Sequence, residues 1–596
     1  MAYKFVADLE EFLRGKYEKF PAGSVIAPEP CPAGMKGDLT INCFRFAKCC
    51  GNPMAVAAEV TEYLNGHADV EHAEAVKAFV NVTLKPAALC RDSVTDVAAL
   101  LESAKLPEEQ RRRILIEFSA PNTNKPQHLG HVRNNTLGMS LGSLLKRVGH
   151  DVIEINLVND RGIHICKSMI AYERFGNGCT PESTGMKGDH LVGKFYVDYN
   201  KALSEEIKAL KAAHPELAEK SSEELFLDTE LGAATQKMLQ QWEAGDPQVR
   251  ALWRKMNGWV FAGFAETYER MGIHFDHTYL ESETYLLGKD IIASGLEKGV
   301  FAKREDGAVI CDLGKLGKKV VLRSDGTSVY ITQDIGTTLR KYEDYHPESM
   351  IWVVGDEQNL HFQMLFTIME KLGYPWAKDL YHLSYGMVNL PTGKMKSREG
   401  TVVDADDLFD EMASLAMDAC RERGGEELSP EELKSRGEII GLGALKFMLL
   451  KFNPKTTIMF DPAASLRFEG DTGPYVQYVA ARIQSIRRKA AERGIEFNPE
   501  KVDWSLLGHE AEKQLAVTAS FYPAALRLAA ERRDCSGLVE YLLNLGKAFN
   551  SFYRECPVLA AETPELAGAR LALSSAVREI IADGLGTLTI GIPEAM

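Results

Sequence analysis

Residues 114–150 read ILIEFSAPNTNKPQHLGHVRNNTLGMSLGSLLKRVGH, and this stretch decides the fold. An apolar run of strand length at 114–118 is followed by a turn rich in Pro and Asn. Apolar residues then recur at helical spacing over 137–148, and Gly149 is a typical helix stop. A second apolar run at 152–158 predicts the next strand. The stretch therefore predicts a βαβ unit whose loop lies at the carboxyl end of a strand, where open α/β sheets bind ligands.

The junction between this strand and this helix suits a nucleoside triphosphate. A helix N-terminus presents unpaired N–H groups and a partial positive charge to phosphate. His128 and His131 are spaced so that both imidazoles can face the same phosphate oxygens, and Gly130 leaves room for a flat adenine ring. The H-x-G-H pattern alone is equally consistent with a loop that carries two surface histidines, so the rest of the chain has to decide.

Composition narrows the class of protein. The chain has 596 residues, enough for three or four domains, and its charged and hydrophobic fractions are those of a soluble globular protein. No apolar run approaches the roughly 20 residues of a membrane span, so we expect no membrane association. Eleven scattered cysteines without a C-x-x-C pair argue against zinc or another bound metal and for reduced thiols in the cytoplasm. The net charge of −15 disfavours diffuse nucleic-acid binding but permits local basic patches.

The patterns divide the chain into three parts. Residues 1–105 mix helical and alternating runs and predict a small α+β domain, which either holds a partner or only packs structurally. Residues 106–463 contain the βαβ unit, a mainly helical insertion at about 171–290, and two Asp-Gly turns that predict hairpins at about 296–333. Residues 464–596 predict an all-α helical bundle. The expected fold class is therefore α/β, with a parallel-sheet core between these two flanking domains.

Two further segments follow predicted strands of the same sheet. A Gly-bounded loop carries Lys394, Lys396 and Arg398, whose charges would stabilise a departing pyrophosphate. In the segment 355–361, Asp356 can cap the following helix, and the polar side chains can hold a ribose. Each segment alone is also consistent with an ordinary solvated turn, but three such segments at the exits of one sheet favour a common site.

Basic and aromatic residues alternate on the C-terminal helical patterns. Arg482, Arg487 and Arg488 lie on one predicted helix, and Phe549 and Tyr553 lie on another. Aromatic rings beside arginines suit stacking on unpaired bases and contacts with phosphates. The alternative is a helical bundle whose Phe and Tyr residues belong to an ordinary core.

Several blocks resemble one enzyme family. HLGH at 128–131 resembles the HIGH motif of class I aminoacyl-tRNA synthetases, and KMKSR at 394–398 resembles their KMSKS loop. EFSAPNTNKPQHLGHVRNN, TSVYITQDIGTTLRKYEDY, VVGDEQNLHF and DTGPYVQYVAARIQSI resemble blocks of arginyl-tRNA synthetases in the family's order, and GDLTINCFRFAK resembles part of their N-terminal tRNA-binding domain. The resemblance implies a Rossmann-type catalytic core with insertions and a C-terminal anticodon-binding domain.

The same resemblance implies the reaction and its site. ATP, accompanied by Mg²⁺, would activate L-arginine to arginyl-adenylate, and the arginyl group would pass to the terminal adenosine of tRNA(Arg). His128, His131, Lys394 and Lys396 are implied to be catalytic. The implied ATP-binding residues are His128, Gly130, His131, Gly355, Asp356, His361, Met387, Val388, Lys394, Met395, Lys396, Ser397 and Arg398. The tRNA-binding candidates are Arg482, Arg487, Arg488, Phe549 and Tyr553.

The KMKSR loop departs from the family pattern. Lys396 and Ser397 stand where KMSKS has Ser and Lys, so the second lysine is displaced or absent. Either Lys394 or Lys396 can therefore contribute most of the effect. The family's need for bound tRNA during activation fits a loop that is incomplete alone.

The residues that match the family's arginine pocket are Glu117, Asn122, Tyr330, Asp334 and Gln358. A guanidinium stays ionised and presents five donors in a planar fork, so it needs acceptors in fixed positions. Such a pocket rejects analogues without an editing domain. From the residues alone, Glu117 in an apolar strand favours a functional role, whereas Asp334 favours a helix cap and Tyr330 is equally consistent with a strand aromatic.

Two alternatives remain at this stage. A class I synthetase for another amino acid is one, although a cysteine enzyme would need zinc ligands and a lysine enzyme would not need this pocket. A synthetase-derived RNA-binding or regulatory protein without catalysis is the other, and the retained histidines, lysines and acidic residues argue against it. Nothing in the sequence demands more than a monomer.

Overall fold

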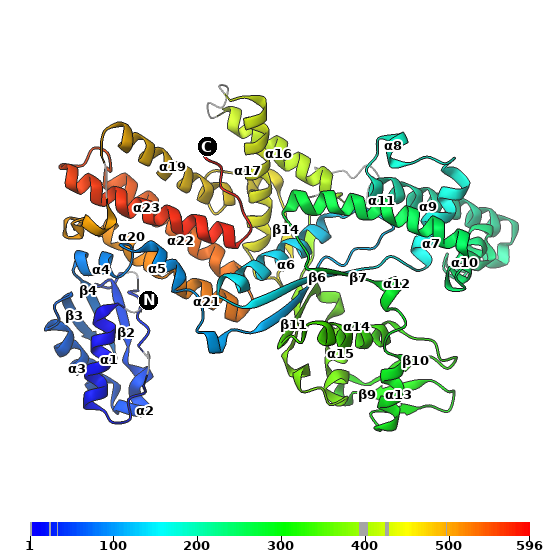
Figure 1. Cartoon of the computed structure of the whole chain (residues 1–596), viewed down its shortest axis with the longest axis horizontal. Helices are drawn as coiled ribbons and strands as arrows, with labels where there is room; N and C mark the ends of the chain where they lie inside the picture. The colour runs from blue at the N-terminus through cyan, green and yellow to red at the C-terminus, as the bar shows by residue number, and fades with distance from the viewer. Residues whose placement is uncertain are drawn as a thin grey trace.

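The computed structural model describes residues 3–22, 26–32, 34–391, 403–422, 428–495 and 498–595. Figure 1 shows a central sheet with the N-terminal unit and the C-terminal helices on one side and a helical insertion on the other. The KMKSR loop lies outside the described residues, and with it the predicted site residues Lys394, Met395, Lys396, Ser397 and Arg398.

The central sheet has five parallel strands in the order β12-β11-β5-β6-β7. In chain order these are β5 (Arg113–Glu117), β6 (Asp151–Val158), β7 (His277–Leu280), β11 (Ser349–Gly355) and β12 (Leu380–Tyr385). Helix α6 (Leu129–Arg147) connects β5 to β6, which confirms the predicted βαβ unit. The strand order reverses between β5 and β11, and open sheets bind ligands at the carboxyl ends of such a switch point.

Successive side chains of β5 point to opposite faces of the sheet and belong to two different hydrophobic clusters. Ile114 and Ile116 join the cluster that contains the buried leucines of α6. Leu115 joins the opposite cluster, with residues of α14 (Tyr330–Tyr345) and α15 (Asn359–Lys371). The sheet is therefore covered on both faces, as expected for parallel strands that read as nearly continuous apolar runs.

The insertion is helical, as predicted, but it ends earlier than expected. Its main helices are α7 (Ile163–Phe175), α9 (Gly188–Ala213), α10 (Glu230–Glu243) and α11 (Pro247–Met271). Within the range assigned to the insertion, His277–Leu280 forms β7, the edge strand paired with β6. This strand of four residues is too short to show an alternating pattern, so the sequence did not reveal it.

The first predicted hairpin is present and the second is not. Asp306-Gly307 joins β8 (Phe301–Lys303) to β9 (Val309–Asp312), and β9 pairs with β10 (Lys318–Leu322). After the Asp325-Gly326 turn the chain makes one bridge and then enters α14 at Tyr330, so the expected second strand is wrong. Ile331 and Ile335 are buried on one face of α14, and this packing outweighs the β propensity of the segment.

The two ends of the chain form packed units that contact each other. The N-terminal unit has a sheet of order β1-β2-β4-β3 (Glu29–Pro30, Leu39–Asn42, Phe79–Leu84, Val70–Val76) with helices that include α1 (Lys4–Lys16) and α3 (Pro53–Asn65). The C-terminal helices include α16 (Ala405–Glu422), α17 (Pro430–Leu450), α19 (Gly473–Glu492), α20 (Glu510–Ser520), α21 (Tyr522–Arg532), α22 (Ser536–Glu555) and α23 (Pro564–Thr587). Between the two units, the Tyr3 hydroxyl donates to Ser520 Oγ at 2.5 Å.

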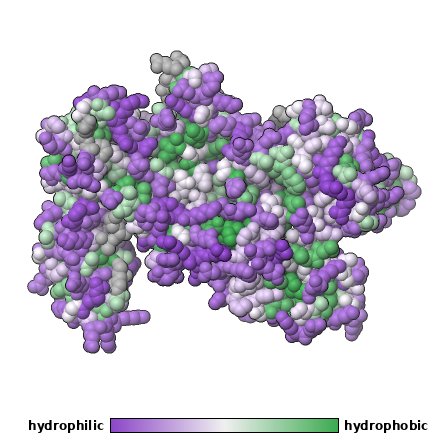
Figure 2. All heavy atoms as spheres, viewed as in Figure 1, coloured by the Kyte–Doolittle hydropathy of each residue, from purple (hydrophilic) through white to green (hydrophobic). Residues whose placement is uncertain are grey.

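The surface is mixed in character. Figure 2 shows a face on which hydrophilic residues predominate and hydrophobic groups are scattered between them. Among the described helices, none combines the length and the apolar character that crossing a membrane requires.

Candidate active site

The two histidines of the H-x-G-H segment form an interlocked cap at the start of α6. Nδ1 of His128 accepts a hydrogen bond from the Gly130 N–H at 3.1 Å, and Nδ1 of His131 accepts one from the His128 N–H at 3.2 Å. The ring centroids lie 4.0 Å apart. Because Nδ1 is the acceptor in both rings, each neutral imidazole carries its proton on Nε2, which makes Nε2–H available as a donor to a ligand.

Burial keeps both imidazoles neutral. It lowers the pKa of His128 to about 4 and that of His131 well below its usual range, and the charge of Lys125 contributes to both shifts. Burial also lowers the pKa of Lys125 itself. An ammonium beside two neutral N–H donors is suited to a phosphate group. Lys125 was not among the predicted site residues, although its place in the same turn, three residues before His128, was a signal.

Gly130 is required by the cap itself. A Cβ at this position would lie 3.0 Å from Cε1 and 3.1 Å from Nδ1 of the His128 ring. A side chain here would therefore displace the ring. This constraint stands beside the predicted adenine contact, which the structure leaves as a prediction.

The exit of β11 lies beside β5 in the sheet. Gly355 ends β11, a 3-10 turn spans Asp356–Gln358, and α15 follows. Asp356 and Gln358 are exposed, and neither side chain caps the helix, so the predicted Asp356 cap is wrong. His361 reaches across to α14 instead, where its Nε2 lies 2.6 Å from Asp334 Oδ2.

Tyr330 and Asp334 lie on one face of α14. Tyr330 is the first residue of the helix and is 77% exposed, and Asp334 follows one turn later. Neither is the strand aromatic or the helix cap that the residues alone also suggested. The Asp334–His361 pair brings a residue predicted for arginine next to one predicted for ATP, as adjacent subsites require.

Glu117 is not an isolated carboxylate. It forms an ion pair with Lys341 of α14, and the two side chains are 8% and 1% exposed, respectively. A buried charge with a partner of opposite sign has a structural explanation, so the reasoning that favoured function from its apolar surroundings is wrong. Glu117 nevertheless faces the helix that carries Tyr330 and Asp334, and its predicted contact with arginine stays a prediction.

Two further candidate pocket residues, Asn122 and Glu281, lie at the exits of β5 and β7. Asn122 is exposed and forms a bridge with Asn159 after β6. Glu281 directly follows β7, and burial raises its pKa to about 7, with the carboxylates of Asp160 and Asp334 adding to the shift. Glu281 is a candidate pocket residue that the sequence did not reveal, because β7 itself was not recognised.

The segment that carries two predicted ATP-binding residues, Met387 and Val388, is tied to α6. Met387 is exposed and Val388 begins β13 (Val388–Asn389), which pairs with β14 (Ile458–Met459). The guanidinium of Arg133, a fully buried side chain of α6, donates to the carbonyl oxygen of Met387 at 3.1 Å and to those of Pro454 and Thr456 at 2.8 Å. One arginine therefore ties this edge to the helix that carries the histidine cap.

The predicted tRNA-binding side chains divide between surface and core. The Arg482 guanidinium lies 5.3 Å from the ring centroid of Tyr553, which is partly exposed on α22. Arg488 is exposed, and Arg487 pairs with Glu579 at 3.4 Å. Phe549 is fully buried, so a base cannot stack on it in this structure, and its assignment to the interface is wrong. For this residue the alternative of an ordinary core aromatic holds.

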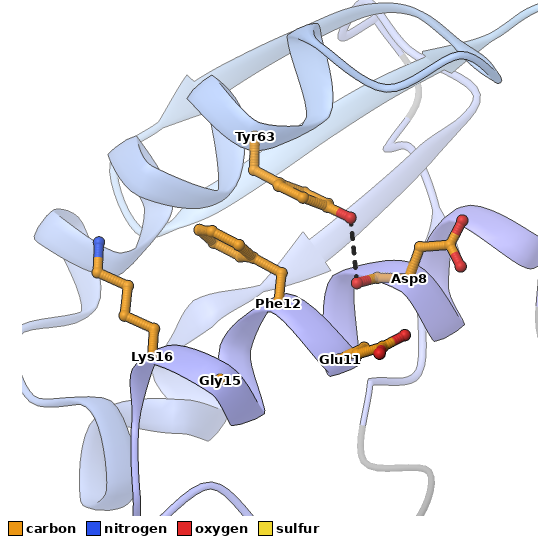
Figure 3. Close-up of a pocket in the computed structure, with 6 residues that line it drawn as sticks. All are labelled: Asp8, Glu11, Phe12, Gly15, Lys16 and Tyr63. Carbon is orange, nitrogen blue, oxygen red and sulfur yellow. Dashed lines mark hydrogen bonds between the residues drawn. The ribbon is translucent and has the colours of Figure 1, made fainter.

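A separate hollow lies in the N-terminal unit. It has a volume of about 660 Å³ and is lined by Asp8, Glu11, Phe12, Gly15, Lys16 and Tyr63. Figure 3 shows the Phe12 ring from α1 beside the Tyr63 ring from α3, with the Tyr63 hydroxyl donating to the Asp8 carbonyl oxygen. Two carboxylates border this hollow, and none of the predicted site residues lines it.

Family models match three segments of the chain. The model described as tRNA synthetases class I (R), catalytic domain, covers residues 96–461. The arginyl tRNA synthetase N terminal domain matches residues 6–84, and the DALR anticodon binding domain matches residues 476–596.

Similar proteins cover nearly the whole chain. An arginine–tRNA ligase of Parabacteroides distasonis is 47% identical over 94% of both chains, and one of Treponema denticola is 44% identical over 98% of this chain and 100% of its own. Among solved structures, the arginyl-tRNA synthetase of Thermus thermophilus superposes with a TM-score of 0.79 at 26% identity over 100% of both chains.

Proposed function

The chain belongs to the arginyl-tRNA synthetase family of class I synthetases, and we propose from this premise how its side chains carry out the reaction. ATP activates L-arginine to arginyl-adenylate with loss of pyrophosphate, and the arginyl group then passes to the terminal adenosine of tRNA(Arg) with release of AMP. The observation that carries the proposal is the pair of neutral imidazoles at the start of α6, which follows β5 at the switch point of the sheet.

In the first step the arginine carboxylate attacks the α-phosphorus, and the bond to pyrophosphate breaks. No proton transfer is required, so positioning and charge stabilisation dominate. The Nε2–H groups of His128 and His131 donate to phosphate oxygens, and Lys125 supplies a positive charge beside them. Mg²⁺ enters with ATP and neutralises phosphate charge. Lys394 and Lys396 are proposed to act on the departing pyrophosphate.

The arginine side chain is proposed to lie between the exits of β5, β7 and the start of α14. Asp334 and Glu281 supply negative charge, Tyr330 and Gln358 supply directional polar groups, and Asn122 lies at the β5 exit. A guanidinium in place among these groups would stabilise the charged form of Glu281, whose pKa burial and the Asp334 carboxylate raise.

For tRNA, we propose that the half-buried Arg482, the exposed Tyr553 beside it, and the exposed Arg488 contact the anticodon arm, within a domain at 464–596. A further RNA-binding domain at 1–105 and the catalytic domain at 106–463 complete the arrangement. We also propose that the protein acts as a cytoplasmic monomer. All eleven cysteines are free thiols, as in a reducing compartment. Light scattering after gel filtration tests the oligomeric state.

Charging of tRNA with labelled arginine, run beside lysine and citrulline, tests the function. Pyrophosphate exchange with and without tRNA would be measured in parallel, and a variant with both His128 and His131 replaced by alanine serves as the inactive control. Charging by arginine alone supports the proposal. Binding of tRNA without charging by any amino acid would instead identify a non-catalytic RNA-binding protein.

A further inference from the structure

A cluster of ionisable side chains joins the helical insertion to the start of α16. Lys187, at the N-cap of α9, has its Nζ 2.6 Å from Asp406 Oδ2 and 3.4 Å from Asp189 Oδ2. His190, in the first turn of α9, has its Nε2 3.2 Å from Asp406 Oδ2 and 3.3 Å from Asp404 Oδ2. Two cations of the insertion therefore hold three carboxylates, two of them from the start of α16.

The same stretch of chain is bonded to the histidine cap. The Leu129 N–H donates to the Val403 carbonyl oxygen at 2.9 Å, and the Ala405 N–H donates to the Gln127 carbonyl oxygen at 3.0 Å. These two bonds flank an antiparallel bridge between His128 and Asp404. The backbone that carries His128 thus lies directly against the backbone that carries Asp404.

Asp404 fixes the geometry of this segment in a second way. Its Oδ1 accepts hydrogen bonds from the N–H groups of Asp406 and Asp407, at 2.8 Å and 3.3 Å, so it caps α16. Its Oδ2 is the oxygen that faces His190. One carboxylate therefore connects the insertion, the start of α16 and the backbone at the histidine cap.

The alternative interpretation of this cluster is a metal-binding site. Oxygen and nitrogen atoms of Asp189, His190 and Asp406 are spaced closely enough to hold one. The Lys187 ammonium already lies on the carboxylates of Asp189 and Asp406, however, and Thr267 Oγ1 donates to Asp406 at 3.2 Å. A divalent cation would have to displace the lysine, so the arrangement is that of an ionic clamp.

We infer that Lys187 and His190 are positioning residues for adenylate formation, because they hold the segment 403–406 against 127–129 and so fix the two imidazoles of the cap. The inference rests on the proposed function, in which those imidazoles bind the triphosphate. Neither Lys187 nor His190 needs to touch a substrate. Their effect passes through Asp404 and Asp406 to the backbone of His128.

Protonation of His190 controls the strength of this clamp. Burial alone would lower the pKa of His190, but the facing carboxylates of Asp406, Asp404 and Asp189 outweigh it, and the pKa is raised. Lys187 is the cation that faces the same carboxylates. A raised pKa means that the clamp is complete at lower pH and weakens as the pH rises through the raised value.

The experiment compares His190→Gln with Lys194→Ala. Lys194 lies on the same helix, and its exposed ammonium pairs with Asp198 at 2.7 Å and lies 5.4 Å from the Phe195 ring centroid, away from the carboxylates of the clamp, so its loss should leave the exchange rate unchanged. Pyrophosphate exchange with arginine and tRNA would be measured from about pH 6.5 to about pH 9. We expect His190→Gln to have a kcat/KM for ATP about 10-fold below wild type at the acidic end and close to wild type at the alkaline end.

Dividing the kcat/KM of the variant by that of the wild type at each pH cancels the effect of ionisations that both proteins share. His190→Lys, which stays charged at alkaline pH, should keep most of the activity and exceed His190→Gln, and it serves as a second variant if the glutamine variant folds poorly. A wild type without arginine-dependent exchange would reject the proposed function. An active wild type whose ratio to His190→Gln does not change with pH, or stays at one throughout, would overturn only the inference about the clamp.

Discussion

At the scale of single residues, the site relies on neutral donors. An imidazolium attracts phosphate more strongly than an imidazole, but burial makes protonation of His128 and His131 unfavourable near neutral pH. Each ring instead uses Nδ1 to accept a backbone N–H, which leaves Nε2–H as the donor that we propose binds phosphate. The two imidazoles are therefore uncharged, but backbone hydrogen bonds hold them in one orientation. Lys125 contributes the positive charge nearby.

Replacing Gly130 with alanine tests this geometry. The new Cβ would lie 3.0 Å from Cε1 and 3.1 Å from Nδ1 of His128, so the ring must shift, which weakens the bond from the Gly130 N–H to Nδ1. We expect kcat for pyrophosphate exchange to fall about 100-fold, in line with misplaced catalytic groups. Gly258→Ala, at an exposed helical position with no atom near the added Cβ, is the matched control and should have wild-type activity. Equal activities would show that the ring tolerates the side chain.

Glu281 predicts a pH dependence of arginine binding. Its pKa is raised to about 7, so the carboxyl is charged above that pH and neutral below it. A guanidinium is attracted only by the charged form, and the Kd for arginine should therefore rise as the pH falls from about 8 to about 6. Calorimetry would show this rise for the wild type, whereas Glu281→Gln should bind arginine weakly at both values. A variant that keeps the wild-type dependence would exclude Glu281 from the pocket.

At the scale of elements, Arg133 joins the start of α6 to the edge that carries the predicted ATP-binding residues Met387 and Val388. Its three hydrogen bonds reach carbonyl oxygens at Met387, Pro454 and Thr456, and burial lowers its pKa to about 10. A planar fork can serve three acceptors in this way, but an ammonium cannot do so from the same place. This edge is therefore sensitive to the shape of the side chain as well as to its charge.

Arg133→Lys should raise the KM for ATP about 10-fold and leave the KM for arginine nearly unchanged, because the lost bonds hold the edge that carries the predicted ATP-binding residues Met387 and Val388. Pyrophosphate exchange with each substrate varied in turn would measure this difference. Arg254→Lys, at an exposed position of α11, controls for the substitution itself. A parallel increase in both KM values would indicate general disruption rather than a local effect.

The elements also show what a sequence can predict. Helices α6 and α15 were predictable because long 3.6-residue patterns end at Gly149 and Gly373, both with positive φ. The strand β7 was too short for a pattern, and the start of α14 resembled a strand because its β-branched residues follow an Asp-Gly turn.

The pairing of side chains could not be predicted from the sequence for a different reason. Glu117 pairs with Lys341, more than two hundred residues away, and Asp334 pairs with His361 across two helices. No periodicity records such contacts, because they arise only when separate segments pack together. The sequence therefore predicts an isolated charge at Glu117 and gives no signal for Glu281.

At the scale of the whole molecule, α6 contacts both functional regions. Its first residues form the histidine cap, and its far end packs on the C-terminal helices. There Arg147 Nε donates to both carboxylate oxygens of Asp583, at 3.0 Å and 2.9 Å, and the Tyr522 hydroxyl donates to the same carboxylate at 2.5 Å. Ser140 Oγ adds a bond to the Leu588 carbonyl oxygen at 3.1 Å. One helix thus joins the candidate active site to the proposed anticodon-binding domain.

Asp583→Ala should destabilise this junction more than the loss of an exposed ion pair would. The substitution leaves the largely buried Arg147 guanidinium without its carboxylate and the Tyr522 hydroxyl without its acceptor. We expect a loss of about 3 kcal/mol in the free energy of unfolding, measured by urea denaturation with intrinsic fluorescence. Glu579→Ala on the same helix removes half-exposed pairs with Arg487 and Arg578, which are better solvated than the Arg147–Asp583 pair, and it should cost no more than about 1 kcal/mol.

The same pair of variants separates docking from chemistry. Asp583 belongs to α23 and contacts Arg147, which lies at the end of α6 away from the histidine cap. A folded Asp583→Ala protein should therefore bind ATP normally. Because its C-terminal helices dock less firmly, its KM for tRNA should rise and should rise further on warming, when the weakened junction opens more often. If Asp583→Ala and Glu579→Ala were equally stable and charged tRNA alike, the Arg147–Asp583 contact would not be what holds the tRNA-binding end of the molecule to its catalytic core.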